Sequence, residues 1–355
     1  MQYVSGQLLT EEGFVEGHVG FEDGVVAEVG RGKAKDSVSE GLILPTFVNA
    51  HTHIADYVVP VDPLLSLAEV VAPPHSLKYR VLAATPESKQ REAIGYLSER
   101  MARGGTSVFS DFREGGIGGA RLMSSAEGAR AFVLGKPQAP HFDREEISAL
   151  LDVAEGIGPS AISDWDYEEL RELASFVRSR GKVFAIHCSE RIREDLDKVL
   201  DLRPSYLVHM TQATDADLER CAQLDVPVVV CPRSNMFFGM APPLARMVRH
   251  GVTVALGTDN AMISMPDLFV EMEFAGRLLR QQGEKRLDCV IRMAASHGRK
   301  IINRSPLIEI DPGAPCDFMV VRSQNGDPVT DLVLRTAGEQ PLLVCMGGRT
   351  WRGPQ

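Results

Sequence analysis

The stretch LILPTFVNAHTH, residues 42–53, is a mostly apolar run that ends in two histidines separated by one residue. Seven more short apolar runs follow it, and amphipathic stretches of about ten to twenty residues separate most of them, which is the pattern of repeated β-α units. Eight such units predict the α/β fold class and a closed (β/α)8 TIM barrel rather than an open doubly wound sheet, with its chemistry at the carboxyl ends of the strands. The eight runs are Leu42–Ala50, Thr106–Asp111, Ala129–Leu134, Glu155–Ser163, Val183–His187, Tyr206–His209, Val226–Cys231 and Val252–Gly257.

Helix-start signals lie between several of these runs. Thr85-Pro86-Glu87 places a proline where a helix can begin. Ser163 to Asp166 and Thr214 to Asp217 each have a hydroxyl residue followed three residues later by a carboxylate, and we interpret both as capping boxes. Helices are therefore expected directly after these positions.

Both ends of the chain have a different sequence pattern, which predicts short strands that alternate with turns. Asp23-Gly24 separates two apolar runs and predicts a hairpin. After about Arg304, further strands are expected at Asp317–Val321, Asp331–Arg335 and Leu342–Met346. We therefore predict a small β-sandwich domain formed by residues 1–45 and 305–355, flanking a barrel at 46–304.

Composition excludes several classes of protein. The 38 basic and 48 acidic residues give a net charge of −10, which disfavours nucleic acid or an anionic membrane surface as partner. No run approaches the roughly 18 apolar residues of a membrane span. The six cysteines are scattered without a CxxC pair, and residues 1–13 lack the basic start of a signal peptide. We therefore expect a cytoplasmic protein that acts on a small molecule.

Residues able to bind metal follow four of the predicted strands. His51 and His53 point to the same side of a strand because they are two residues apart. The fifth run ends in His187-Cys-Ser-Glu190, the sixth in His209, and the eighth in Gly257-Thr-Asp259-Asn260. Imidazoles with a carboxylate suit zinc or ferrous iron, which would lower the pKa of a bound water. Glu190 and Asp259 are then the candidates for proton transfer.

At these residues the sequence resembles a known family. LPTFVNAHTH (44–53), HCSE (187–190), VCPRSN (230–235) and VALGTDNA (254–261), in this order, are similar to motifs of the amidohydrolase superfamily. The closest similarity is to its branch of deaminases and chlorohydrolases, which includes guanine and cytosine deaminases. The resemblance covers about Leu42 to Leu279, and IDPGAPCDFMVV (310–321) resembles the family's returning β-domain strand.

The resemblance implies a role for each site residue. His51, His53, His187 and Asp259 would bind one divalent metal ion, zinc before iron. Glu190 would shuttle protons, and His209 would orient the hydroxide or the substrate. The implied reaction is hydrolytic deamination of a small aminated heterocycle of purine, pyrimidine or pterin type. Metal-bound hydroxide would attack the ring carbon while Asp259 takes the water's proton, and ammonia would leave after Glu190 protonates a ring nitrogen.

Two departures from the family pattern affect this interpretation. Binuclear relatives have a carboxylated lysine on the fourth strand, whereas Glu155–Ser163 contains none, which favours one metal. Lys136 lies just past the third strand, so an error of one in the strand count would restore a binuclear site. Relatives of the deaminase branch also have a substrate-facing histidine after Gly-x-Gly-Pro; here Ser160 follows Pro159. The substrate of those relatives is therefore not transferred to this chain.

Substrate contacts and alternatives remain open at this point. Ser160, Phe237, Phe238 and Asn260 are the candidate contacts, with Asp56 and Arg113 as further loop residues near strand ends. The long proline-rich stretch from Ile54 to Thr85 could cover the pocket. The same machinery could instead cleave a cyclic amide or an aryl halide, and a non-catalytic barrel is the alternative outside enzymes. A homodimer is expected only because many barrels pair through their helices.

Overall fold

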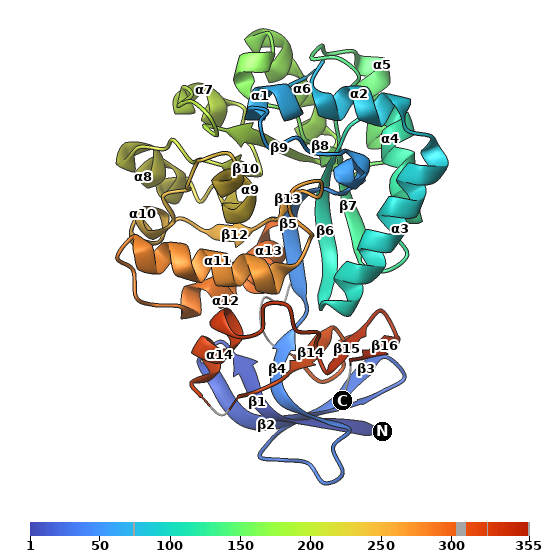
Figure 1. Ribbon diagram of the computed structural model, residues 1–355, viewed down its shortest axis with the longest axis vertical. Helices are drawn as coiled ribbons and strands as arrows, with labels where there is room; N and C mark the ends of the chain where they lie inside the picture. The colour runs from blue at the N-terminus through green and yellow to red at the C-terminus, as the bar shows by residue number, and fades with distance from the viewer. Residues whose placement is uncertain (74, 303–309, 325, 354–355) are drawn as a thin grey trace.

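The computed structural model describes residues 1–73, 75–302, 310–324 and 326–353, and its largest element is a parallel sheet that closes on itself (Figure 1). Its order is β12-β11-β10-β9-β8-β7-β6-β5-β13. Because β13 follows β12 after only Gly257 and Thr258 and pairs with β5, this sheet is a closed eight-unit barrel, as predicted. The strands are β5 (Phe47–His53), β6 (Thr106–Arg113), β7 (Arg130–Gly135), β8 (Gly156–Ile157), β9 (Val183–Cys188), β10 (Tyr206–His209), β11 (Val228–Val230), β12 (Val254–Leu256) and β13 (Asp259–Asn260).

Helices surround the barrel, and two short ones, α1 and α2, lie at the end far from the chain termini (Figure 1). The helices are η1 (Ile54–Val58), α1 (Leu67–Val71), α2 (Leu77–Ala84), α3 (Glu87–Arg103), α4 (Gly116–Leu122), η2 (Met123–Ser125), α5 (Arg144–Leu151), η3 (Ile162–Asp164), α6 (Tyr167–Ser179), α7 (Leu196–Asp201), α8 (Asp215–Gln223), α9 (Pro232–Phe237), α10 (Leu244–Arg249), α11 (Leu268–Gln281), α12 (Asp288–Ala294), α13 (Ser296–Ile301) and α14 (Pro328–Leu334).

Strands from both ends of the chain form a second, mixed sheet with the order β16-β15-β14-β4-β1-β2-β3. This sheet curls, because the backbone N–H of Val26 in β3 donates to the carbonyl of Ala314, close to the start of β14. Its apolar residues form a core of their own around Val4, Phe21 and Phe318. The strands are β1 (Gln2–Thr10), β2 (Gly13–Glu22), β3 (Val25–Arg31), β4 (Ser39–Pro45), β14 (Phe318–Val321), β15 (Leu343–Met346) and β16 (Arg349–Arg352).

The junction between the two sheets lies within the first predicted run. That run is divided, since β4 ends at Pro45 in the mixed sheet and β5 begins at Phe47 in the barrel. The proposed domain boundary at 45/46 lies between them. The boundary at 304/305 falls within residues 303–309, outside the described residues.

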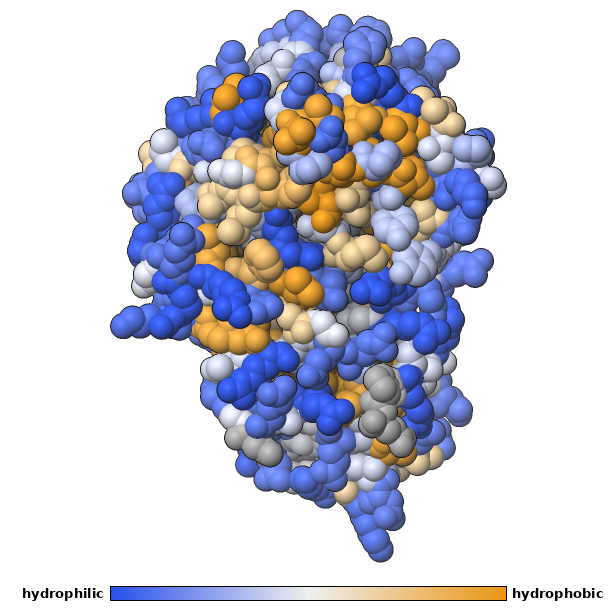
Figure 2. All heavy atoms as spheres, viewed as in Figure 1, coloured by the Kyte–Doolittle hydropathy of each residue, from blue (hydrophilic) through white to orange (hydrophobic). Residues whose placement is uncertain are grey.

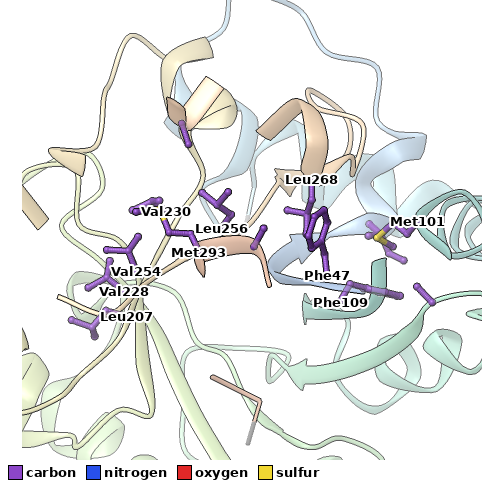
Figure 3. Packing of buried hydrophobic residues seen from close by; sticks show 14 of the residues in the cluster. Phe47, Met101, Phe109, Leu207, Val228, Val230, Val254, Leu256, Leu268 and Met293 are labelled. Atoms are coloured by element: carbon purple, nitrogen blue, oxygen red, sulfur yellow. The ribbon is translucent and has the colours of Figure 1, made fainter. Parts of the chain in front are cut away.

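An apolar layer between the barrel strands and the surrounding helices holds the fold together. Figure 3 shows Phe47, Phe109 and Leu268 packed at one side of this layer and Leu207, Val228 and Val254 at the other. Each fully buried aliphatic or aromatic side chain of this kind stabilises the fold by about 1.5–3 kcal/mol relative to exposure. The described helices include none that combines the length and apolar character required to cross a membrane.

Three local predictions are confirmed. The turn at Asp23-Gly24 joins β2 to β3, and both residues have positive φ, 50° and 77°, as a type I′ hairpin turn requires. Helix α3 begins at Glu87, after Pro86. Thr214 and Asp217 form the predicted capping box of α8.

Three others are wrong in detail. The segment Asp331–Arg335, predicted as a strand, belongs mostly to α14, because Asp327 caps a helix that begins with Pro328. The N-cap of α6 is Asp166, whose carboxylate accepts from two backbone N–H groups, and not Ser163. The fourth run also overstates its strand, since β8 covers only Gly156–Ile157.

Candidate metal centre and active site

Two neighbouring strands, β5 and β13, bring the first three candidate ligands together. His51 and His53 both lie in β5 and point into the barrel mouth, whereas Thr52 points away and donates to the Asp111 carboxylate at 2.9 Å. Asp259 of β13 is paired with Thr52, and its side chain lies beside both histidines. Its Oδ1 is 3.2 Å from His51 Nε2 and 3.7 Å from His53 Nε2.

The ends of β9 and β10 supply the next two histidines. The His187 ring centroid lies 5.0 Å from that of His51, and His209 stacks on His187 at 5.3 Å. Ligand atoms of His51, His187 and His209 lie within 4.8 Å of one another, as do those of His51, His53 and Asp259. Beneath them the Phe112 ring contacts His51 edge-on at 4.5 Å and forms an apolar floor.

The chemistry of these groups fits a divalent cation. Among the described residues, neither ring nitrogen of His51 nor Oδ1 of Asp259 makes a hydrogen bond, although all three atoms are buried. Burial lowers the pKa of His51 to about 3, which keeps the ring neutral. Burial alone would raise the pKa of Asp259, but contact with His51 and the nearby His209 holds it well below its usual range. Neutral imidazole and ionised carboxylate are the forms that bind metal.

Hydrogen bonds fix the Asp259 carboxylate. Its Oδ2 accepts from Ser234 Oγ at 2.6 Å and from Asn260 Nδ2 at 2.8 Å. These two bonds leave Oδ1 directed at the histidines. A cavity opens beside these residues, and Asn260, predicted as a substrate contact, is part of its lining. The Asn260 amide, however, donates its hydrogen bond to Asp259.

Glu190 lies at the edge of the same cavity, with its side chain 20% exposed. Its Oε1 accepts from Asn235 Nδ2 at 3.2 Å and lies 3.5 Å from His209 Nε2. The same Asn235 amide lies 3.2 Å from His209 Nδ1 and so holds both residues. Burial raises the pKa of Glu190, which favours its protonated form at higher pH than for a free glutamate.

Backbone conformation at the site is strained. His209 has φ of 79° and Asp259 of 57°, in the left-handed region that non-glycine residues avoid. Such residues cost about 1–3 kcal/mol each and concentrate at functional sites. The strain therefore agrees with a functional role for the two strand ends.

A charged network that the sequence did not predict adjoins the histidines. Glu114, directly after β6, places Oε1 3.0 Å from His53 Nδ1 and 2.8 Å from the Lys78 ammonium of α2. Asp56 lies 3.6 Å from the same ammonium. Burial would raise the pKa of Glu114, but Lys78 and His53 hold it well below its usual range. Glu114 follows a strand end as the other site residues do, which is the signal that could have found it.

Of the remaining predicted substrate contacts, one lines the cavity and the others do not. Ser160 lines the cavity. Phe237 and Phe238 are not among the residues lining it: they contact each other at 5.0 Å, and Phe237 is 42% exposed. Phe237 is the last residue of the short α9 and Phe238 directly follows it, whereas the buried Ser234 and Asn235 of the same helix face the site. Arg113 is buried but donates to Gln90 and to the carbonyl of Gly119, which makes it structural.

The stretch 54–85 does reach over the cavity. Leu67, Ala68 and Val71 of α1, with Ala72 and Pro73, form an apolar part of its lining. Figure 2 shows that apolar side chains of this face gather around α1 and α2, while the mixed sheet is covered mainly by hydrophilic ones. The cavity thus has the histidines and carboxylates on one side and the apolar residues of α1 on the other.

Comparison with known proteins agrees with this arrangement. A model described as the amidohydrolase family matches residues 42–350. The chain belongs to the amidohydrolase family. This amidohydrolase is 31% identical over 345 residues to a protein of Archaeoglobus fulgidus provisionally named an aminohydrolase, covering 94% of each chain.

Other relatives have names that state a reaction. A 5-methylthioadenosine/S-adenosylhomocysteine deaminase of Haloarcula marismortui is 28% identical over 346 residues, covering 84% of this chain and 77% of that protein. The solved structure of an adenosine deaminase from Xanthomonas campestris with bound zinc has a TM-score of 0.83 at 20% identity, covering 98% and 92% of the two chains. This amidohydrolase is thus a hydrolytic enzyme acting on C–N bonds, with a TIM-barrel fold and a site suited to a divalent metal.

Proposed function

We propose that this amidohydrolase is a metal-dependent deaminase of a small aminated heterocycle, of purine, pyrimidine or pterin type. The observation that carries the proposal is the convergence of four histidines, Asp259 and Glu190 at the ends of β5, β9, β10 and β13, where all of them except His51 line one cavity. The deaminase names of its relatives support the reaction class. The apolar cover from α1 suits a planar ring.

We propose one metal ion, zinc before iron, held by His51, His53, His187 and Asp259. When bound, such an ion lowers the pKa of a water ligand towards neutrality. A single ion agrees with the strand count: Lys136 follows β7, the third barrel strand, and β8, the fourth, contains no lysine. The zinc in the Xanthomonas campestris structure supports the choice of metal.

Asp259 and Glu190 divide the proton transfers in this proposal. Asp259 Oδ1 accepts the proton of the attacking water, because Ser234 and Asn260 already occupy Oδ2. Glu190 holds a proton more readily than a free glutamate and donates it to a ring nitrogen. His209, held by Asn235, orients the substrate from the side of Glu190.

The test is ammonia release by zinc-loaded and iron-loaded protein with a panel of aminated purines, pyrimidines and pterins. Glu190→Gln is the matched blank because it keeps the size of the side chain but removes the acid. We expect ammonia from one ring class and a loss of at least about 100-fold in kcat for Glu190→Gln, as general acid–base groups contribute, with its metal content unchanged. Full activity of Glu190→Gln would contradict the proton-shuttle role.

The same assay separates the alternatives. If the panel releases no ammonia, an aryl halide and a cyclic amide are tested next. Release of chloride or of a ring-opened acid would show that the metal centre catalyses one of these other hydrolytic reactions. Protein that takes up no ion on addition of zinc or iron would favour a non-catalytic barrel. Cytoplasmic location and a homodimer stay predictions from the sequence.

A further inference from the structure

Two lysines line the same cavity as the histidines, and only Lys78 has a carboxylate within hydrogen-bond distance; Lys136 has one only at the longer distance of 3.8 Å. Lys78, with a side chain 3% exposed, lies 2.8 Å from Glu114 Oε1 and 3.6 Å from Asp56 Oδ2. The same Glu114 Oε1 also lies 3.0 Å from His53 Nδ1. The charge of Glu114 is therefore largely committed to Lys78 and His53.

Lys136 is the second lysine, placed at the carboxyl end of the barrel directly after β7. Its ammonium donates to the neutral Tyr79 hydroxyl at 3.0 Å, and its distance to Glu114 Oε1 is 3.8 Å. The side chain is only 13% exposed. A cation removed from water in this way costs free energy unless an anion or several hydrogen bonds compensate it. Lys136 retains two N–H donors beyond the bond to Tyr79, since an ammonium has three.

Among the described residues, Glu114 is the only carboxylate of the cavity within ion-pair distance of Lys136. Glu194 lines the cavity, but its carboxylate accepts the backbone N–H groups of Ser189 and Ser163. Asp164 and Arg191 lie at exposed positions of the lining. The whole chain carries a net charge of −10, so the positive charge at Lys136 is local and opposite in sign to that of the protein.

We propose that Lys136 determines substrate specificity by pairing with a carboxylate carried by the heterocycle. This rests on the proposed deaminase function and names its substrate class: an aminated ring with an anionic substituent. The ring would lie against the apolar α1 residues Leu67 and Val71, with its amino-bearing carbon towards Asp259 and Glu190 and its carboxylate towards Lys136. Tyr79 and Glu114 hold the ammonium in place for this contact.

The test uses two pairs of compounds that differ only by a carboxylate: pterin with pterin-6-carboxylate, and cytosine with cytosine-5-carboxylate. Kinetics are measured for the zinc-loaded wild type, Lys136→Met, Lys136→Arg and the control Lys89→Met, an exposed lysine of α3 outside the cavity. A hydrogen bond to a charged group predicts a loss of about 10- to 100-fold in kcat/KM for Lys136→Met with the carboxylated member, mainly through KM. The partner without carboxylate should change less than about twofold, and Lys136→Arg should restore most of the loss.

Equal losses on both members of a pair, or a wild type that does not prefer the carboxylated one, would overturn the inference. Two zinc ions per chain in the wild type and one in Lys136→Met would also overturn it, because Lys136 would then be a metal ligand. Calorimetric binding to zinc-loaded protein separates this inference from the proposed function. If no compound releases ammonia, tighter binding of the carboxylated member that Lys136→Met abolishes still supports the inference, whereas equal or absent binding of both members refutes it.

Discussion

Among single residues, Glu114 contacts a candidate metal ligand without being one itself. Its carboxylate contacts His53 Nδ1, which leaves Nε2 of the same ring directed at Asp259. A carboxylate in this position fixes the orientation of a histidine ligand and raises its basicity. Lys78 in turn keeps the carboxylate ionised and in place. The proposed metal site therefore depends on Lys78 of α2, a helix that contributes no candidate ligand.

We expect Glu114→Gln to weaken zinc binding about 10- to 100-fold, the usual effect of removing the partner of a ligating histidine. The amide keeps the shape of the side chain but loses the charge that pairs with His53 and Lys78. Competition with a chromophoric chelator measures the dissociation constant. Glu92→Gln, at an exposed glutamate of α3, is the control and should leave it unchanged. An unaltered constant in Glu114→Gln would show that His53 is oriented without it.

The sequence could identify the six central residues because each follows a buried run and the parallel order brings those ends to one rim. It could not identify Lys78, since a lysine in a helical stretch gives no sign of which carboxylate it will meet. Phe237 and Phe238 were, conversely, predicted to contact the substrate although they do not line the cavity. Their place after VCPRSN suggested the cavity, but the direction of a side chain at the end of a six-residue helix depends on how that helix packs.

Among the elements, the contact between β12, β13 and β5 determines the shape of the site. Gly257 lies between β12 and β13, and a Cβ built there would be 2.8 Å from His51 Cβ and 2.9 Å from its backbone nitrogen. A backbone atom cannot move aside as the end of a flexible side chain can. Thr258 N donates to the carbonyl of His51 at 3.0 Å, so the two segments cannot separate without losing hydrogen bonds.

We expect Gly257→Ala to lower the free energy of unfolding by about 1–3 kcal/mol, as overpacking does, and to weaken zinc binding in the same protein. Urea unfolding and the chelator competition measure the two effects. Gly118→Ala in α4 is the matched control, because a Cβ at that position meets nothing within 4 Å. Removing a helical glycine there should stabilise the protein slightly. Equal behaviour of the two variants would contradict the tight contact at His51.

Element boundaries were the weaker part of the sequence prediction. Asp331–Arg335 has strand-like composition, yet the Asp327 cap and Pro328 start a helix just before it, which spacing within the segment does not reveal. The division of Leu42–Ala50 between β4 and β5 was also invisible, because the residues on both sides of the break, 42–45 and 47–50, are all buried and mostly apolar.

For the whole molecule, the proposed ligands connect the first and the last strand of the barrel. His51 and His53 lie in β5 and Asp259 in β13, the two strands whose pairing closes the sheet. Figure 1 shows β5 and β13 side by side at the centre of the barrel. The mixed sheet and both termini lie below the barrel in this view. An ion bound there would stabilise the closure directly and the mixed sheet only indirectly.

Removal of the metal should therefore destabilise the molecule unevenly. At a free zinc concentration about 100 times the dissociation constant, binding contributes about 2.7 kcal/mol to stability. Hydrogen exchange with and without chelator should show faster exchange of backbone amides in β5 and β13 and little change in β1 and β2. A uniform change over both sheets, or none, would contradict a metal held at the closure.

The same closure has a consequence for synthesis on the ribosome, where chains emerge and begin to fold from the N-terminus. The two histidines of β5 emerge early, but Asp259 follows only after seven further barrel strands, β6 to β12, have left the exit tunnel. A nascent chain therefore cannot assemble the complete set of proposed ligands, and we expect the ion to be bound late, by a barrel that is already largely folded.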